Sequence, residues 1–146
     1  MVTIEEYNEK YLGECARIYA ETFSSAPWND SWDEDRSRKR LSDIIYSPGF
    51  YGLVAMDNNL IRGAVLGNIE VSYNGLIYHL REMFVENKSR GQSIGSEIIS
   101  NLESKLSQKK VSSIYLMTAK GPMTESFYKN NSFKRIKKMI IMSKQV

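Results

Sequence analysis

The chain has 146 residues, 42% of them hydrophobic and 25% charged, which is typical of a soluble globular protein of one domain. Its 20 Lys and Arg residues against 17 Asp and Glu residues give a formal charge of +3, too small and too dispersed to predict a nucleic-acid-binding face. A single cysteine (Cys15) excludes an internal disulfide, and one Cys with one His excludes a structural zinc site, so no metal is expected.

The beginning of the chain predicts a cytoplasmic protein. Residues Met1–Glu6 end in two acidic side chains and lack the apolar core of a signal peptide. No apolar run approaches the roughly 20 residues that span a bilayer. A lone cysteine is also typical of a reducing compartment. We therefore expect no membrane partner.

Two amphipathic helices are predicted after a short strand at Val2–Ile4. Apolar and aromatic side chains recur every four residues from Tyr7 to Phe23, which indicates the buried stripe of a helix. Pro27 disfavours helix in the residue before it. A second helix is predicted to begin near Ser31, because the sequence Ser31–Glu34 has the form of a capping box. It ends at the turn sequence Ser-Pro-Gly at 47–49.

The rest of the chain reads as strands and two further helices. Apolar runs separated by turn residues predict three consecutive strands, Phe50–Met56, Leu60–Val71 and Leu76–Val85. Helical spacing of apolar residues then alternates with strand-like runs, giving a helix over 93–108, a strand at Val111–Thr118, a helix at Met123–Asn130 and a last strand at Phe133–Met142. Tight turns make the first three strands antiparallel, whereas the helix over 93–108 requires a parallel crossover. We therefore predict an α/β fold with a mixed, mostly antiparallel central sheet and helices on both faces.

The segment from Glu82 to Ser96 carries the chemistry. A strand ends here, a glycine-containing loop follows, and a helix begins. Backbone N–H groups of such a loop and of the first helical turn are suited to bind phosphate. Gly91 and Gly95 would let a ligand approach the backbone closely. The alternative is a loop that tolerates glycine and binds nothing, and the loop alone leaves both interpretations open.

The same stretch resembles the GNAT superfamily, the GCN5-related N-acetyltransferases. The family's loop has Gln or Arg, two variable residues, Gly, one variable residue, and Gly or Ala; here Arg90 fills the first position and Gly95 the last. Ser93 stands where the family has Gly, which costs about 1 kcal/mol or more if the position requires a positive φ. The segment 82–85 is similar to the family's fourth strand. The segment 127–133 is similar to its late Phe-Tyr-x-x-x-Gly-Phe sequence, with Ser132 in place of Gly.

This resemblance implies one GNAT domain over residues 1–146 with the acyl-CoA N-acyltransferase fold. It implies transfer of an acetyl group from acetyl-CoA to a primary amine of a small molecule or protein, by direct attack on the thioester. A homodimer is a further expectation of the family. The residues that would bind the cofactor are the end of the fourth strand and the loop, namely Met83, Phe84, Val85, Arg90, Gly91, Gln92, Ser93, Ile94, Gly95 and Ser96.

The resemblance also implies catalytic roles for two residues. Glu82 is the candidate base, because strand alternation places it on one face with Leu80 and Phe84, and His79 on the other. The alternative is an ion-paired Glu82, with Arg62 on the neighbouring strand as its partner. Tyr128 matches the tyrosine that gives a proton to the CoA thiolate. Its alternative is a packing tyrosine.

Stabilisation of the thioester oxygen is expected from backbone groups, and binding of the amine is expected from the loop between the first two helices. Backbone N–H groups around Phe84 and Val85 are the expected donors to the carbonyl oxygen of the thioester. Trp28 and Asp30 are the candidate substrate-binding residues for a cationic amine. Asp33 and the two acids after it are expected to complement the dipole of the second helix.

Two other functions stay open at this stage. A non-catalytic acyl-CoA-binding module would keep the loop without turnover, and a nucleic-acid-binding domain is disfavoured by the dispersed charge. Within the enzyme interpretation, the acceptor is an aminoglycoside, a polyamine, an amino acid or a protein amine, and the sequence does not choose among them.

Overall fold

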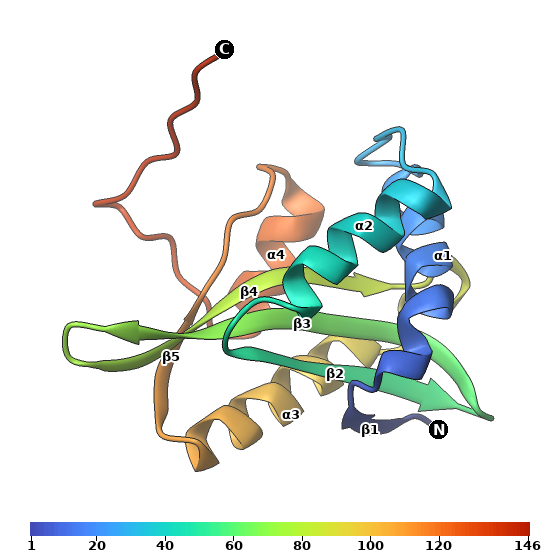
Figure 1. Ribbon diagram of the computed structural model, residues 1–146, viewed down its shortest axis with the longest axis horizontal. Helices are drawn as coiled ribbons and strands as arrows, with labels where there is room; N and C mark the ends of the chain where they lie inside the picture. The colour runs from blue at the N-terminus through green and yellow to red at the C-terminus, as the bar shows by residue number, and fades with distance from the viewer.

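The computed structural model describes residues 1–146 and contains one five-stranded sheet with helices on both faces (Figure 1). The strands lie in chain order: β1 (Thr3–Glu6), β2 (Phe50–Asp57), β3 (Leu60–Ser72), β4 (Gly75–Val85) and β5 (Val111–Tyr115). The first four are antiparallel neighbours, and β4 and β5 are parallel. The predicted mixed, mostly antiparallel sheet is therefore confirmed.

The helices divide the apolar core into two layers. α1 (Leu12–Phe23) and α2 (Glu34–Ile45) bury one cluster against the sheet, and α3 (Ile94–Gln108) buries a second cluster on the opposite face. α4 (Pro122–Asn130) follows β5, and single 3₁₀ turns precede α1 (η1, Glu9–Tyr11) and follow β4 (η2, Asn87–Ser89). None of the helices is long and apolar enough to cross a membrane.

The second helix begins two residues later than the capping-box prediction. Its N-cap is Asp33, whose carboxylate accepts a hydrogen bond from the Arg36 N–H at 2.7 Å. The predicted cap at Ser31 is wrong because the half-buried Trp32 packs against the core before the helix starts, with its ring edge-on against Tyr19 at 5.1 Å. The expectation that Asp33 serves the helix N-terminus is confirmed.

The predicted last strand, Phe133–Met142, does not form. Phe133 packs against the Tyr128 ring at 5.3 Å and Arg135 pairs with Glu125, but the chain then runs away from the body (Figure 1). β5 also ends at Tyr115 and not at Thr118. Strand propensity alone was misleading here, because a strand needs a hydrogen-bonding partner and the chain beyond Arg135 meets none. The sheet therefore ends at β5.

A β-bulge interrupts the pairing of β3 with β4. Leu66 lies opposite Glu82, but the next residue, Gly67, lies opposite Leu80. Arg81 is therefore an extra residue on β4, which bends the strand and shifts the alternation of its side chains by one position.

Because of the bulge, the side chains of β4 that were predicted to lie on one face of the sheet lie on two different faces. Leu80 packs with the α3 cluster, whereas Phe84 packs with the α1 and α2 cluster, so these two residues do not share a face. His79 lies opposite Asn68, whose amide donates to the Ile44 carbonyl of α2. Directly opposite residues share a face, so His79 and Glu82 both point toward α1 and α2, and their predicted separation is wrong.

The parallel pairing of β4 with β5 is short. It runs from Leu76 to His79 on β4 and stops at Tyr115 on β5. Beyond this point the last six residues of β4 have no neighbour on that edge, because the chain after β5 separates from them. The separation leaves the edge of β4 free over the part of the strand that leads into the glycine-containing loop.

Candidate active site

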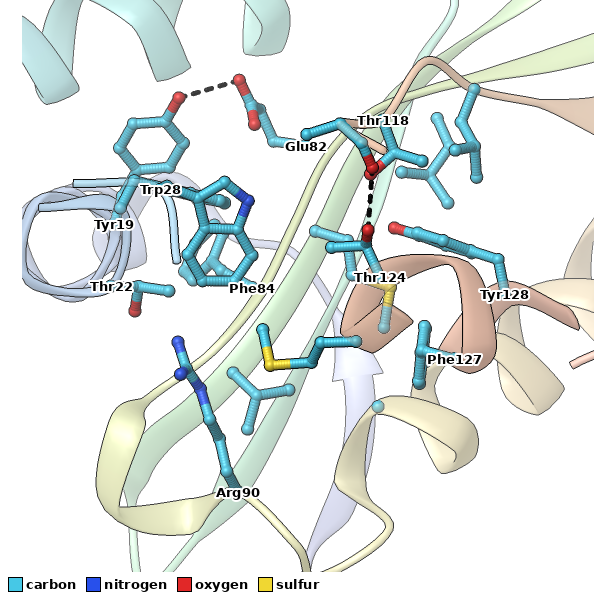
Figure 2. A pocket seen from close by; sticks show the side chains of 18 of the residues that line it. Tyr19, Thr22, Trp28, Glu82, Phe84, Arg90, Thr118, Thr124, Phe127 and Tyr128 are labelled. Atoms are coloured by element: carbon cyan, nitrogen blue, oxygen red, sulfur yellow. Dashed lines mark hydrogen bonds between the residues drawn. The ribbon is translucent and has the colours of Figure 1, made fainter. Parts of the chain in front are cut away.

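A cavity of about 720 Å³ opens where β4 and β5 separate. Its walls are the end of β4, the loop before α3, the segment after β5, the start of α4 and the loop between α1 and α2 (Figure 2). Every predicted site residue except Gln92 lines it: Trp28, Asp30, Glu82, Met83, Phe84, Val85, Arg90, Gly91, Ser93, Ile94, Gly95, Ser96 and Tyr128. Gln92 lines a smaller neighbouring cavity of about 330 Å³ together with Arg62 and Lys88.

The free edge of β4 presents backbone groups to this cavity. The Glu86 N–H donates to the Arg62 carbonyl of β3 at 2.8 Å. Peptide groups alternate between the two edges of a strand, so the N–H and C=O of Met83 and Val85 point to the open edge, and those of Phe84 point to β3. Of the two expected N–H donors, Val85 is thus the one directed to the cavity. Phe84 instead contributes its ring, packed against Tyr19 at 5.7 Å.

The loop before α3 has the backbone of a phosphate-binding turn. Gly91 has a φ of 79°, and a Cβ placed there meets nothing within 4 Å, so the space in front of the loop is open. Ser93 caps α3 with a φ of 62° and makes no side-chain cap bond. The first N–H groups of α3 therefore keep the free donors of a helix N-terminus. These features fit the pyrophosphate of a nucleotide cofactor.

Both serines that replace glycine in the resembling motifs have left-handed backbone. The φ of Ser93 is 62° and that of Ser132 is 69°. A residue with a Cβ is strained in this region by about 1 kcal/mol or more. The two positions therefore keep the backbone conformation that glycine favours, and each serine is strained by adopting it.

Gly95 has a packing role. A Cβ at this position would lie 2.9 Å from the Phe127 ring. The absence of a side chain at Gly95 therefore lets α4 pack closely against the start of α3. The sequence alone assigned Gly91 and Gly95 the same purpose, the close approach of a ligand. The open space lies at Gly91 only.

The Glu82 carboxylate is anchored from both neighbouring helices. Its Oε2 accepts a hydrogen bond from the Tyr19 hydroxyl at 2.9 Å (Figure 2) and from Arg40 Nε at 3.0 Å. The side chain is 14% exposed, at the edge of the cavity. Arg62 is not its partner, because Arg62 pairs with Glu86 at 2.6 Å. Both bonds to Glu82 go to Oε2, and the carboxylate keeps its second oxygen for another donor.

Tyr128 presents its hydroxyl to the cavity. Its ring is held between Phe127 and Phe133, at 5.0 and 5.3 Å, and its hydroxyl points into the cavity from α4 (Figure 2). Burial, and then the charge of Glu82, raise the pKa of Tyr128 to about 12. The hydroxyl therefore stays protonated at neutral pH and can donate a proton or a hydrogen bond.

The loop between α1 and α2 closes the other side of the cavity. The Trp28 ring packs edge-on against Phe23 at 4.9 Å, and the Arg90 guanidinium lies 5.3 Å from its centre. A predicted substrate residue and a predicted cofactor residue thus touch across the cavity (Figure 2). Asp30 is exposed, and its N–H donates to the Phe23 carbonyl at 2.8 Å.

Several residues that line the cavity were missed by the sequence reasoning. They are Tyr19 on the side of α1 and a set that follows β5 (Leu116, Met117, Thr118, Ala119 and Thr124). Tyr19 belongs to the apolar stripe of the first helix, a pattern that core packing already explains. In the second set, Leu116, Met117 and Thr118 were predicted as strand and Thr124 as helix, and only the separation of β5 from β4 makes them a wall of the cavity.

Comparisons with known proteins agree with this architecture. The family model described as an acetyltransferase (GNAT) domain matches residues 9–143. A possible acetyltransferase from Clostridium difficile 630 superposes with a TM-score of 0.84 at 12% identity, covering 100% of this chain and 99% of that one. No curated protein has a similar sequence.

Two solved aminoglycoside acetyltransferases have the same fold. The enzyme meta-AAC0020 from an uncultured soil metagenomic sample, solved with sisomicin, gives a TM-score of 0.78 at 16% identity, covering 99% of this chain and 96% of that one. AAC(6')-Iy, solved with the bisubstrate analogue CoA-S-monomethyl-acetylneamine, gives a TM-score of 0.77 at 15% identity, covering 100% and 99%.

The contact of Gly95 with Phe127 predicts a loss of stability on substitution. Gly95→Val should lower the melting temperature of the ligand-free protein, since overpacking costs about 1–3 kcal/mol. Ser100→Val, at an exposed site on the same helix, is the control for helix propensity. The loss should shrink in a Phe127→Leu background, and an unchanged melting temperature for Gly95→Val would contradict the packing role.

Proposed function

Because the chain belongs to the GNAT acetyltransferase family, we propose that it transfers an acetyl group from acetyl-CoA to a primary amine of a small molecule or protein. The observation that carries this proposal is the cavity where the free edge of β4, the loop before α3 and the Tyr128 hydroxyl converge. We further propose that residues 1–146 form one such domain and that it acts in the cytoplasm.

The residues around the cavity suit acetyl-CoA. The N–H and C=O of Met83 and the C=O of Val85 would hold the pantetheine arm, as the free strand edge offers both donors and acceptors. The N–H groups from Gly91 to Ser96 would hold the pyrophosphate at the N-terminus of α3. Bound there, acetyl-CoA supplies the thioester carbonyl that the amine attacks.

The proposed reaction needs two proton movements and one charge to be stabilised. The amine nitrogen bonds to the acetyl carbon, the carbon–sulfur bond breaks, the nitrogen loses a proton and the sulfur gains one. Glu82 takes the proton from the amine, directly or through a water molecule. The Val85 N–H stabilises the negative charge that develops on the carbonyl oxygen. The Tyr128 hydroxyl gives a proton to the sulfur.

The charges of the cavity favour an acceptor with a single amine. Its lining holds two carboxylates, Asp30 and Glu82, and two guanidinium groups, Arg81 and Arg90. One of the carboxylates is already paired with Arg40. The wall beside them is aromatic and suits one cationic amine with an apolar body, whereas a polycation would meet little negative charge.

A non-catalytic acyl-CoA-binding module is the second candidate, because the ion pair of Glu82 with Arg40 gives that residue a structural role as well. The two functions differ in one observable. An enzyme releases free CoA from acetyl-CoA faster when an amine is added, and a binding module does not.

Acetyl-CoA should stabilise the protein. At 100 times the dissociation constant, ligand binding adds about 2.7 kcal/mol to the free energy of unfolding. For a chain of this size the melting temperature rises by roughly 5–10 °C. Differential scanning fluorimetry measures the shift, with adenosine as a control that lacks the pantetheine arm. The absence of any shift at millimolar acetyl-CoA would overturn the proposed function.

The balance of charges in the cavity predicts the acceptor class. Aralkyl monoamines should be acetylated with a higher kcat/KM than aminoglycosides or polyamines, since they need one carboxylate and use the aromatic wall. A panel of amines assayed for release of free CoA ranks the acceptors. A clear preference for polycations would contradict the argument from charge while leaving the acetyltransferase function intact.

Removal of the Tyr128 hydroxyl should slow the chemical step. Tyr128→Phe keeps the packing between Phe127 and Phe133, so the affinity for acetyl-CoA should be almost unchanged while kcat falls roughly 100- to 10,000-fold. The pKa of about 12 keeps the hydroxyl protonated, so the deficit should stay constant from pH 7 to pH 10. A variant with normal turnover would reduce Tyr128 to a packing residue.

Glu82→Gln should lower the rate at neutral pH by about 100-fold, the usual effect of losing a general base. The deficit should shrink as the pH approaches about 10, where a primary amine loses its proton without help. Initial rates across this pH range measure it. Arg40→Met removes the same ion pair but keeps the carboxylate, and serves as the control. Equal losses in both variants at every pH would assign Glu82 to structure.

A further inference from the structure

The bulge on β4 turns two consecutive side chains, Arg81 and Glu82, to the same face of the sheet. Asn68 on β3 lies on the face of α2, and its amide donates to the Pro48 carbonyl at 3.2 Å. Arg81 Nη1 donates to Oδ1 of Asn68 at 3.5 Å, so the guanidinium reaches the face toward which Glu82 points. Consecutive side chains of a regular strand lie on opposite faces, and a bulge relaxes this rule. A guanidinium and a carboxylate therefore line the cavity from adjacent positions.

Arg81 has no carboxylate partner in the protein. Its side chain makes one long hydrogen bond, to a neutral amide, and takes part in no ion pair. Glu82 pairs with Arg40 instead. Glu70, on β3, accepts a hydrogen bond from the Tyr115 hydroxyl at 2.8 Å. A half-buried guanidinium without a counter-ion is costly, and its planar fork of N–H groups matches an oxyanion. The unpaired guanidinium therefore suits an anionic group of a ligand in the cavity.

The position of Arg81 along β4 separates it from the phosphates of the cofactor. The phosphate-binding turn lies beyond the end of β4, at Gly91. A strand rises about 3.3 Å per residue, so Arg81 lies about 13 Å back from Val85, the last residue of β4. That separation exceeds the length of an arginine side chain. Arg90, on the loop itself, is the guanidinium near the phosphates. Arg81 lies instead beside Glu82, the residue that meets the amine in the proposed reaction.

We propose that the acceptor is a free amino acid with an aromatic side chain, an inference that rests on the proposed acetyltransferase function. Its carboxylate binds Arg81, its amine lies at Glu82, and its ring packs on the aromatic wall at Trp28 and Phe23. One carbon separates the amine from the carboxylate of an α-amino acid, so the two groups need an anion and a cation side by side. The cavity as a whole holds two carboxylates and two guanidinium groups, which suits a zwitterion of no net charge.

The carboxylate of the acceptor takes no part in the chemical step. The α-amino nitrogen bonds to the acetyl carbon as the carbon–sulfur bond breaks. Glu82 takes the proton that the nitrogen loses, and Tyr128 gives a proton to the sulfur. The carboxylate keeps its charge throughout and holds the nitrogen in place. Arg81 therefore determines which amine is acetylated, and its removal should affect acceptors without a carboxylate very little.

Two acceptors that differ only in the carboxylate test this inference. L-Phenylalanine and 2-phenylethylamine share the ring, the chain and the primary amine, and release of free CoA gives kcat/KM for each. The wild type should prefer L-phenylalanine by about 10- to 100-fold, the effect of one charge-assisted contact. Arg81→Met keeps the apolar stem without the charge, and should remove this preference while 2-phenylethylamine is acetylated as before. The basicity of each amine is the same in both proteins, so the change in the ratio reports the contact alone.

Arg36→Met is the matched control, since it removes the same charge from an exposed position of α2 outside the cavity. It should keep the wild-type preference. A ratio of the two kcat/KM values that is equal in the wild type and in Arg81→Met would overturn the inference. A wild type that acetylates only 2-phenylethylamine would overturn it too. Both results leave the acetyltransferase function intact.

A binding measurement tests the inference without turnover. Titration calorimetry of protein saturated with CoA should show binding of L-phenylalanine, with an affinity that falls about 10- to 100-fold in Arg81→Met and is unchanged in Arg36→Met. L-Phenylalaninamide, which has no carboxylate, should bind the wild type and Arg81→Met equally. If acetyl-CoA raises the melting temperature but L-phenylalanine does not bind, the amino-acid acceptor alone is refuted. If acetyl-CoA gives no shift, the proposed function is refuted and this inference with it.

Discussion

The short parallel contact between β4 and β5 is the constraint on which the rest of the site depends. Since β4 hydrogen-bonds to β5 only as far as His79, its last six residues keep one set of backbone donors and acceptors unused. α3, the crossover between these two strands, starts directly beside that free edge, so unpaired strand groups and unpaired helix N–H groups face one space. α4 then supplies Tyr128 from the far side, held there by the fit of Phe127 over Gly95.

The bulge at Arg81 explains how the Glu82 carboxylate lies beside the cavity at a small cost in free energy. Without the extra residue, Glu82 would point into the apolar layer under α3, where an unpaired charge is expensive. With it, Glu82 turns toward α1 and α2 and meets one donor from each, Tyr19 and Arg40. The same three residues connect both helices to the strand, so the position of the aromatic wall of the cavity and that of the carboxylate are fixed together.

Local patterns predicted the helices and strands well, because periodicity and turn residues act over a few positions. The loop before α3 was predicted correctly because its motif also spans only a few residues, and Ser93 adopts the positive φ that the motif requires. Features that depend on residues far apart in the chain were not predicted. The bulge depends on how β3 and β4 align, and the sequence around Arg81 carries no pattern that predicts a bulge. The segment Phe133–Met142 has every local property of a strand, yet a strand exists only where another offers its edge, which no local pattern encodes. The partner of Glu82 was misassigned because Arg40 lies 42 residues away in the chain.

The contact of Arg90 with Trp28 makes the protein its own optical reporter. The chain has two tryptophans, Trp28 and Trp32, and both stand in the wall of the cavity. Its intrinsic emission at long wavelength therefore comes from this one place and carries no background from elsewhere in the molecule. A guanidinium 5.3 Å from the centre of an indole ring is part of that chromophore's electrostatic surroundings, so we expect any movement of Arg90 to change the emission. Occupancy of the cavity can thus be followed in unlabelled protein, in real time, and without turnover.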